Sequence, residues 1–269
     1  MPELPEVETV ARGLQKCLPG STITGAVVYW PRTLARPAPD DFQARIAGRR
    51  VESVGRRGKY VVITLDHGYL LVHLKMSGRL FIAPAGELLD SHIRAVLDLD
   101  GGRQLRFRDA RKFGRIYLVD KPEEVTGPLG PEPLAADFSP EDFGRLLSQR
   151  SGWLKSMLLN QEFLAGVGNI YADEILFVAR LNPLRRADTL TAGEQARLYE
   201  AIRSVLQRAI NASGTTLPDR NYLDGEGRAG EYTAEVYGRT GEPCLVCGTP
   251  IERVVIGGRS THFCPHCQR

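Results

Sequence analysis

Four cysteines near the C-terminal end restrict what the last part of this chain can fold into. Cys244 and Cys247 form one C-x2-C pair, and after sixteen residues Cys264 and Cys267 form a second. Two such pairs suit a tetrahedral zinc site, in which each pair supplies two thiolates from one turn. A segment this short needs such a staple to hold its shape. We therefore predict one structural Zn²⁺, with no open coordination position for catalysis.

Disulfide bonds are the alternative for these cysteines, and the sequence disfavours them. The chain is long, carries no secretion signal, and spaces the two pairs too regularly for a typical disulfide framework. The fifth cysteine, Cys17, lies near the end of the first expected helix. We expect it to be a small buried residue.

The length and the charge distribution favour a two-domain protein with a surface for a polyanion. The 269 residues suit two domains, and the absence of a membrane-length apolar run or a leader indicates a soluble intracellular protein. Net charge is only +3, but residues 45–60 and 103–115 each carry six Arg or Lys against one acid. Phe107 and Phe113 lie within the second stretch, a combination typical of nucleic-acid surfaces. Two solvated strand faces would explain the charges equally well.

Short strands fill the first half of the chain, and helices follow. Alternating or β-branched segments separated by turn signals predict an antiparallel sandwich or barrel. The strands are expected at 22–30, 51–57, 59–66, 69–76, 79–83, 93–99, 103–108 and 115–119. Helical patterns follow at 140–148, 152–161, 171–180 and 191–211. A stretch rich in proline and glycine near residues 126–140 is expected to link the two parts.

The N-terminal residues offer an unusual nucleophile. Removal of Met1 would leave Pro2 with a free secondary amine, which could attack a sugar aldehyde carbon and form an iminium ion. Glu3, beside it, could move protons. The simpler interpretation is that Pro2 and Pro5 open a helix, and these residues alone favour it. An apolar stripe does predict a helix that ends near Pro19-Gly20; its members are Leu4, Val7, Ala11, Leu14 and Leu18.

A glycine-rich turn precedes one of the later helices. In the segment 166–174, GVGNIYADE, glycines would expose backbone N–H groups at a helix start, which is a natural phosphate site. Asn169 could add a side-chain donor. An ordinary tight turn capped by Asn169 is the alternative.

Together these motifs resemble the formamidopyrimidine-DNA glycosylase family, over the whole chain. They occur in the order PELPEVE at 2–8, RGKY at 57–60, HLKMSG at 73–78, DARKFG at 109–114, GPEPL at 130–134, GVGNIYADE, VYGR at 236–239 and the four cysteines. The sister family, endonuclease VIII, usually begins with Pro-Glu-Gly-Pro. Leu4 therefore favours the branch that repairs oxidised purines, 8-oxoguanine and formamidopyrimidines, and leaves the oxidised-pyrimidine branch as the alternative.

The resemblance implies an α+β fold of two domains with duplex DNA in the cleft between them. A β-sandwich catalytic domain is expected at 1–126 and a linker at 127–139. A helix–two-turn–helix domain with a lesion-recognition loop is expected at 140–232, and a zinc ribbon with a β-hairpin at 233–269. The glycines and sparse apolar residues of 212–232 suggest that this loop orders over an extruded base. A monomer in the bacterial cytoplasm, associated with the nucleoid and without a membrane partner, is expected.

The resemblance also implies roles for particular residues. Pro2 would attack C1′ of the damaged nucleotide, Glu3 would transfer protons, and Lys59 would contact the neighbouring phosphate. Glu6 would support the N-terminal region. The iminium would then drive β- and δ-elimination, so the protein would be both a glycosylase and an abasic-site lyase.

The remaining implied residues contact DNA. Met76, Arg111 and Phe113 would fill the gap left by the extruded nucleotide, because apolar wedges offset the loss of stacking. The donor-only guanidinium of Arg111 would prefer an orphaned cytosine. The implied phosphate contacts are Lys155, Asn169, Tyr237 and Arg259, and His73 would lie beside the DNA unless it is a satisfied strand histidine.

Two departures from the family and two competing functions remain open. Lys75 stands where many relatives have glycine, and could add a phosphate contact; Ala110 stands where many have proline.

A non-catalytic zinc-ribbon DNA-binding protein would explain the ribbon and the basic stretches but not Pro2-Glu3. Acid–base catalysis by Pro2 on a small carbonyl compound would explain Pro2 alone. If Met1 is retained, Pro2 is an amide and no iminium can form.

Overall fold

The computed structural model describes residues 1–216, 222–225 and 227–269. Its contacts divide the chain into two compact units. The first holds Met1–Pro128 and Ala212–Glu231, and the second holds Leu129–Asn211 and Tyr232–Arg269. Residues 212–231, which the sequence groups with the helical part, therefore make their contacts with the N-terminal part.

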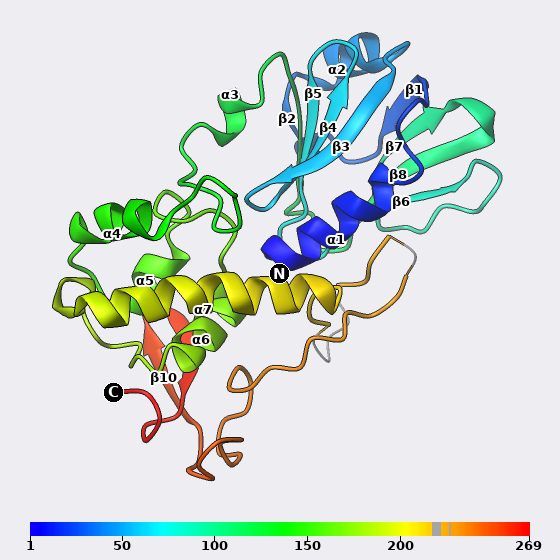
Figure 1. Cartoon of the computed structure of the whole chain (residues 1–269). Coiled ribbons are helices and arrows are strands. Elements are labelled where there is room, and N and C mark those ends of the chain that lie inside the picture. Colours follow the sequence, from blue (N-terminus) through cyan, green and yellow to red (C-terminus); the bar gives the residue numbers. More distant parts are fainter. Residues whose placement is uncertain (217–221, 226) are drawn as a thin grey trace. The chain divides into compact units, whose positions relative to one another are not determined.

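The first unit is a sandwich of two sheets (Figure 1). One sheet has the order β1-β7-β8-β6, with β1 at Ile23–Val28, β6 at Gly78–Pro84, β7 at Ile93–Leu99 and β8 at Arg103–Asp109. The other has the order β2-β9-β5-β4-β3, with β2 at Leu34–Arg36, β3 at Val51–Arg57, β4 at Tyr60–Leu65, β5 at Tyr69–His73 and β9 at Arg115–Val119. Both sheets give residues to one core, and the predicted antiparallel sandwich is confirmed. Only the β2–β9 pair among the described strands is parallel.

Helix α1, Leu4–Gln15, packs its apolar stripe into this core. The stripe is formed by residues such as Leu4, Val7 and Leu14, all at most 3% exposed. The helix ends at Gln15, earlier than the predicted Pro19-Gly20, although Leu18 beyond it is still buried. Cys17 is exposed, so its predicted burial is wrong: at this point the chain has left the stripe, and only Leu18 turns inwards.

Helix α2, Pro39–Ile46, and the short strand β2 were not predicted from the sequence. Two turns of helix bury only Phe42 and Ile46, which is too few positions to show a 3.6-residue period. Strand β2 has three residues, one of them buried. Short α3, Glu123–Thr126, precedes the second unit.

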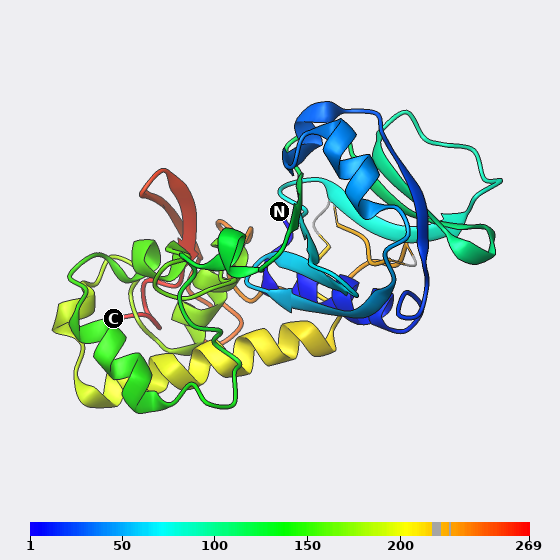
Figure 2. The ribbon, with the colours of Figure 1, turned by 90° about the horizontal axis from the view of Figure 1, so that it is seen from above.

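The second unit is helical with a hairpin (Figure 2). Its helices are α4 at Pro140–Ser148, α5 at Leu154–Leu159, α6 at Asn169–Val178 and α7 at Ala192–Asn211, close to the predicted ranges. Helix α6 is buried along eight of its ten residues, because it packs against α5, α7 and the hairpin. The hairpin pairs β10, Glu252–Ile256, with β11, Arg259–Phe263. Phe177 of α6 shares a small core with Cys244 and Cys264, which fixes the ribbon to the helices.

No helix in the described ranges is both long and apolar enough to cross a membrane.

Candidate functional site

The start of helix α1 holds Pro2 and Glu3 in a buried, hydrogen-bonded frame. Glu3 is the N-cap, and its backbone N–H donates to Oε2 of Glu6 at 2.8 Å. The Glu3 side chain accepts from the Glu6 N–H in return, completing a capping box. Pro2 is buried and Glu3 is 2% exposed. The helix therefore presents both residues in one fixed geometry.

The second carboxylate oxygen of Glu6 reaches a distant part of the chain. Oε1 accepts the Thr215 N–H at 2.8 Å, in a buried contact. Gly214 lies at φ +83°, and a Cβ there would lie 2.6 Å from this oxygen, so only glycine fits. Glu6 thus joins the N-terminus to the segment that follows α7. The role expected for Glu6, support of the N-terminal region, stays a prediction, and this contact supports it.

The described residues of 212–231 make their contacts within the first unit. Tyr222 is 6% exposed in the core, and its hydroxyl donates to the Ser213 carbonyl at 3.0 Å. The Gly230 N–H donates to Oγ1 of Thr216 at 2.8 Å. Both ends of the segment are therefore anchored. Its expected role in ordering over a base depends on the centre, 217–221 and 226, which lies outside the described residues, and remains a prediction.

Lys59 lies at the tip of the β3–β4 hairpin. Gly58 and Lys59 form its two-residue turn, because Arg57 pairs with Tyr60 and Gly58 takes a φ of +54°. Arg56 fixes this tip, donating from Nε to Glu8 of helix α1 at 2.9 Å and from Nη1 to the Gly58 carbonyl at 3.1 Å. The hairpin that carries Lys59, itself 7% exposed, is thus joined to the helix that carries Pro2.

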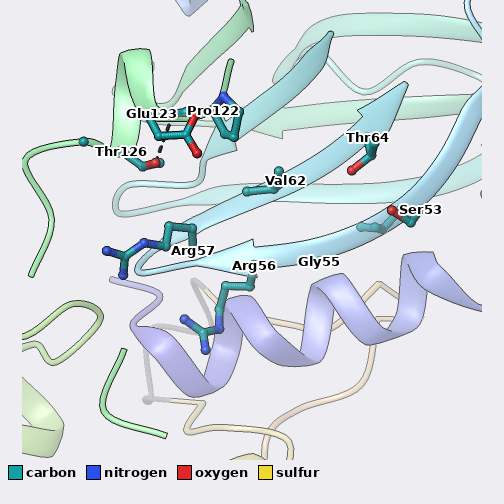
Figure 3. Close-up of a pocket in the computed structure, with 11 residues that line it drawn as sticks. Ser53, Gly55, Arg56, Arg57, Val62, Thr64, Pro122, Glu123 and Thr126 are labelled. Carbon is teal, nitrogen blue, oxygen red and sulfur yellow. Dashed lines mark hydrogen bonds between the residues drawn. The ribbon is translucent and has the colours of Figure 1, made fainter. Parts of the chain in front are cut away.

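The ion pair between Glu8 and Arg56, which joins helix α1 to the β3–β4 hairpin, also shifts the pKa of Glu8. Burial raises the pKa of Glu8, but hydrogen bonds and charge from Arg12 and Arg56 outweigh burial, and the net shift is downwards. Figure 3 shows Arg56 directed towards helix α1. The pocket drawn there, about 420 Å³ between β3, β4 and α3, is lined by none of the predicted site residues.

Asp109 holds together the two loops that carry the expected wedge residues. Its Oδ1 accepts from the Ser77 hydroxyl at 2.5 Å and from the Arg111 N–H at 3.2 Å. Its Oδ2 accepts the Gly114 N–H at 2.7 Å. The carboxylate is fully buried. Asp109 begins the motif DARKFG, but the sequence did not indicate its anchoring role, because its partners lie up to 32 residues away.

The residues expected to act as wedges project from this buried anchor. Met76 is 37% and Phe113 48% exposed, and Arg111 is exposed, with its guanidinium 5.1 Å from the Phe113 ring centroid. Because Asp109 joins the loops that carry them, these exposed side chains form a candidate contact surface. Ala110 is exposed, and nothing in the structure explains its departure from proline.

His73 is a neutral hydrogen-bond donor. Its Nδ1 accepts the Lys75 N–H at 3.0 Å, so in the neutral ring Nε2 carries the proton. Burial lowers its pKa to about 3, and the charges of Lys75 and Lys59 add to the shift. Its ring packs edge-on against the ring of Tyr60, with 4.7 Å between the two ring centroids. The histidine is therefore both a packed strand residue and a donor with a fixed tautomer.

We predict that Asp109→Ala destabilises the protein by about 3–5 kcal/mol, because a buried hydroxyl, one buried N–H group and one partly buried N–H group lose a charged acceptor. Urea unfolding measures this change. Asp98→Ala is the control, since Asp98 accepts only a partly exposed bond from Gln104 and should cost less than about 1 kcal/mol. Similar small losses for both variants would show that Asp109 does not anchor the loops.

In the second unit, the start of helix α6 is joined to the ribbon hairpin. Lys155 donates from Nζ to the Asn169 carbonyl at 2.8 Å and to Asp173 Oδ1 at 2.6 Å. Asp173 Oδ2 accepts the His262 N–H at 2.9 Å. Lys155 is 0% exposed, so in this structure it supports the helix start from within instead of facing a phosphate as the resemblance implies.

The other predicted phosphate contacts surround this junction. Asn169 begins α6, and its Nδ2 donates to the Ser260 carbonyl at 2.9 Å, next to Arg259. Arg259 is exposed at the hairpin turn. Tyr237 lies with its ring 5.1 Å from His262. Asn169, Tyr237 and Arg259 are thus brought to one region of the second unit.

Glu174 is a further buried anchor that the sequence did not indicate. Its carboxylate accepts backbone N–H groups of Glu235, Val236 and Tyr237, at 2.7, 3.0 and 2.9 Å. It lies in the predicted GVGNIYADE motif, one residue after Asp173. The two acids therefore fix the ribbon region to α6 from adjacent helix positions.

The four ribbon cysteines fit one zinc ion. Their Sγ atoms all lie within 4.8 Å of one another, with Cys244–Cys267 at 4.0 Å and Cys247–Cys264 at 3.5 Å. Tetrahedral zinc with Zn–S bonds of about 2.3 Å separates sulfurs by about 3.8 Å, which matches. Burial raises the pKa of the Cys264 and Cys267 thiols, so a bound cation would favour their thiolate forms.

We predict one zinc per chain by elemental analysis of the reduced protein. Cys264→Ser should lose the metal and weaken DNA binding, because the hairpin that carries Arg259 loses its staple. Cys17→Ser is the matched control and should keep the metal, since Cys17 is an exposed cysteine outside the cluster. Wild-type protein without zinc would contradict the assignment.

Comparison with known proteins defines the class. Residues 1–116 match the formamidopyrimidine-DNA glycosylase N-terminal domain, residues 129–220 its H2TH domain, and residues 241–269 the zinc finger found in FPG and IleRS. Together these domains define a DNA glycosylase with abasic-site lyase activity.

Whole-chain relatives agree. Formamidopyrimidine-DNA glycosylases of Herpetosiphon aurantiacus and Chloroflexus aurantiacus are 50% and 49% identical, over all of this chain and 100% and 98% of theirs. The crystal structure of MutM (Fpg) from Thermus thermophilus is 44% identical, with a TM-score of 0.89, over 99% of this chain and 98% of that one. A Lactococcus lactis Fpg variant bound to Fapy-dG DNA is 33% identical, with a TM-score of 0.92, over 100% of both chains. The chain belongs to the formamidopyrimidine-DNA glycosylase family.

Proposed function

We propose that this chain excises oxidised purines, 8-oxoguanine and formamidopyrimidines, from duplex DNA and cuts the strand at the abasic site. The observation that carries this proposal is the buried Pro2-Glu3 pair, held by the Glu6 capping box beside the hairpin of Lys59. Lactococcus lactis relatives crystallised with Fapy-dG and abasic-site DNA support the substrate class. The bacterial origin of the relatives supports a site of action in the bacterial cytoplasm, on nucleoid DNA.

The chemistry begins with the Pro2 amine after removal of Met1. Its nitrogen attacks C1′, the glycosidic bond breaks, and the base leaves with a proton. Opening of the sugar ring then gives a C1′ iminium. Loss of a C2′ proton expels the 3′ phosphate, a second elimination expels the 5′ phosphate, and water hydrolyses the iminium to release Pro2. These steps balance with water and protons alone.

The neighbouring residues divide the supporting work. Glu3 lies next to the nucleophile and transfers protons during base loss and ring opening. Lys59 binds the phosphate beside the lesion, and neutral His73 on the adjacent strand donates from Nε2. Because His73 needs no proton from solvent to donate, its contribution stays constant across neutral and mildly acidic pH.

Extrusion of the damaged nucleotide leaves a gap in the duplex, and Met76, Arg111 and Phe113 fill it. Unstacking costs about a few kcal/mol, which exposed apolar side chains on rigid loops offset. The Arg111 guanidinium has only donors, so it pairs with the O2 and N3 acceptors of cytosine better than with adenine.

The second unit grips the DNA backbone without taking part in the chemistry. Arg259 and Asn169 are the direct phosphate contacts, Tyr237 lies beside them, and the zinc ribbon fixes their spacing. We assign catalysis to 1–126, linkage to 127–139, DNA binding to 140–211 and the zinc ribbon to 233–269. Lesion recognition is assigned to 212–232, of which residues 212–231 belong to the first unit. Thr215 and Thr216 lie at the base of the proposed recognition loop.

We predict that borohydride reduction during reaction with 8-oxoguanine DNA traps a covalent adduct at Pro2. Only a Schiff-base intermediate is reducible, so the adduct separates this enzyme from a zinc-ribbon binding protein. Peptide mass mapping identifies the residue, and intact mass confirms that Met1 is absent. An N-terminal extension that keeps Pro2 as an amide is the control and should give no adduct. An adduct at Lys59, or none with DNA bound, would overturn the assignment.

The same assay separates oxidised-purine repair from two further activities. Preferential trapping on oxidised pyrimidines would indicate endonuclease VIII-like specificity. Reaction of the Pro2 amine with small carbonyl compounds but not with duplex DNA would indicate a small-molecule enzyme. Neither outcome is expected for a chain with Leu4 and these relatives.

A further inference from the structure

One end of the five-stranded sheet gathers basic side chains. Strand β4 begins at Tyr60, β5 ends at His73 and β9 begins at Arg115. Tyr60 pairs with His73, and His73 pairs with Arg115, so the three strand ends lie in one row. Lys59 directly precedes this row and Lys75 lies two residues beyond it.

Lys75 and Arg115 have no acidic partner among the described residues. The Arg115 Nη1 donates to the carbonyls of Phe113 and Gly114, at 3.1 and 2.9 Å. Asp109 and Asp120, the two acids nearest to Arg115 in sequence, already have partners: Asp109 in the loop anchor and Asp120 in an ion pair with Arg45. Both cations are partly buried, and burial together with the Arg115 charge lowers the pKa of Lys75. Two cations in this arrangement are unfavourable without an anion.

The backbone at Lys75 adds a second indication. Its φ is +54°, a left-handed conformation that is strained for a residue with a Cβ and free for glycine. Glycine at this position would remove both the strain and the charge repulsion. A lysine at this position therefore indicates a favourable interaction of its side chain that offsets the backbone strain and the charge repulsion.

The cations also flank the wedge residues. Lys75 directly precedes Met76, and Arg115 follows Phe113 by two residues. A ligand that meets Lys75 and Arg115 must lie next to these exposed side chains, which suits a phosphodiester of a DNA strand better than a free anion.

We propose that Lys75 and Arg115 form a subsite for one DNA phosphate, additional to the phosphate contacted by Lys59 and His73. This inference rests on the proposed function. The subsite increases affinity for the lesion-bearing duplex through counterion release and holds the strand beside Met76 during extrusion.

The test measures binding to a duplex with a non-cleavable tetrahydrofuran abasic site, across salt concentrations. Lys75→Gln should reduce the slope of log K against log salt by about one. Between about 50 and 200 mM salt, its affinity should then change about three- to fourfold less than that of the wild type. Lys75→Arg should keep the slope. Lys16→Gln, which removes an exposed lysine just beyond α1, is the control and should also keep it.

The double variant Lys75→Gln with Arg115→Gln tests whether the two cations share one phosphate. A shared phosphate predicts a total slope loss of about one, whereas separate phosphates predict about two and would overturn the single subsite. Lys75→Gly should raise Tm by a few degrees while lowering the slope, because it relieves the backbone and removes the charge. That pair of results excludes misfolding as the cause of weaker binding.

Two outcomes separate this inference from the function beneath it. Wild-type protein that fails to bind the abasic duplex contradicts the proposed function. Wild-type binding with an unchanged slope in Lys75→Gln contradicts only the subsite. Inorganic phosphate should displace DNA no better than chloride at equal ionic strength; a phosphate-specific effect lost in Lys75→Gln would make this a free-phosphate site and overturn the assignment to DNA.

Discussion

The buried carboxylate of Glu6 is the contact on which the geometry of the N-terminus depends. One oxygen accepts the Glu3 N–H and the other the Thr215 N–H. A carboxyl group that is 1% exposed is costly to bury without hydrogen-bond partners, so the two N–H groups stabilise its position. Because proximity chemistry is sensitive to displacements of about 1 Å, the nucleophile proposed at this chain end needs such a restraint.

Two other buried carboxylates join distant segments of the chain in the same way as Glu6. Asp109 joins the loops of Met76 and Arg111, and Glu174 joins α6 to the ribbon region around Tyr237. Each is a buried acid that accepts several N–H or hydroxyl groups from distant segments. The exposed residues proposed to touch DNA are thus carried by short loops with fixed buried bases. A charged acceptor suits this purpose because its hydrogen bonds are stronger than neutral ones.

Periodicity and local motifs predicted most of the fold. Strand β4 alternates buried Val61, Ile63 and Leu65 with more exposed residues, and the four cysteines carry their geometry in their spacing. The contacts that build the site were not predictable in this way, because Glu6 and Thr215 are 209 residues apart. Lys155 shows the limit of transferring roles by resemblance: its position in the chain matches, but its burial against Asp173 gives it a structural contact. Helix α2 was missed because two buried residues make no detectable period.

The central claim is that Glu6 positions Pro2 and Glu3 without itself transferring protons. The most direct test is the single-turnover rate of borohydride-trapped adduct formation by Glu6→Gln on abasic DNA, measured across pH. In Glu6→Gln the side-chain NH2 group replaces one carboxylate oxygen and meets a backbone N–H group, so two donors face each other and the contact is lost. We therefore expect adduct formation to be about ten- to hundredfold slower at every pH, with the shape of the pH profile unchanged. An unchanged rate, or the loss of one limb of the profile, would contradict the claim, the latter by making Glu6 the proton carrier.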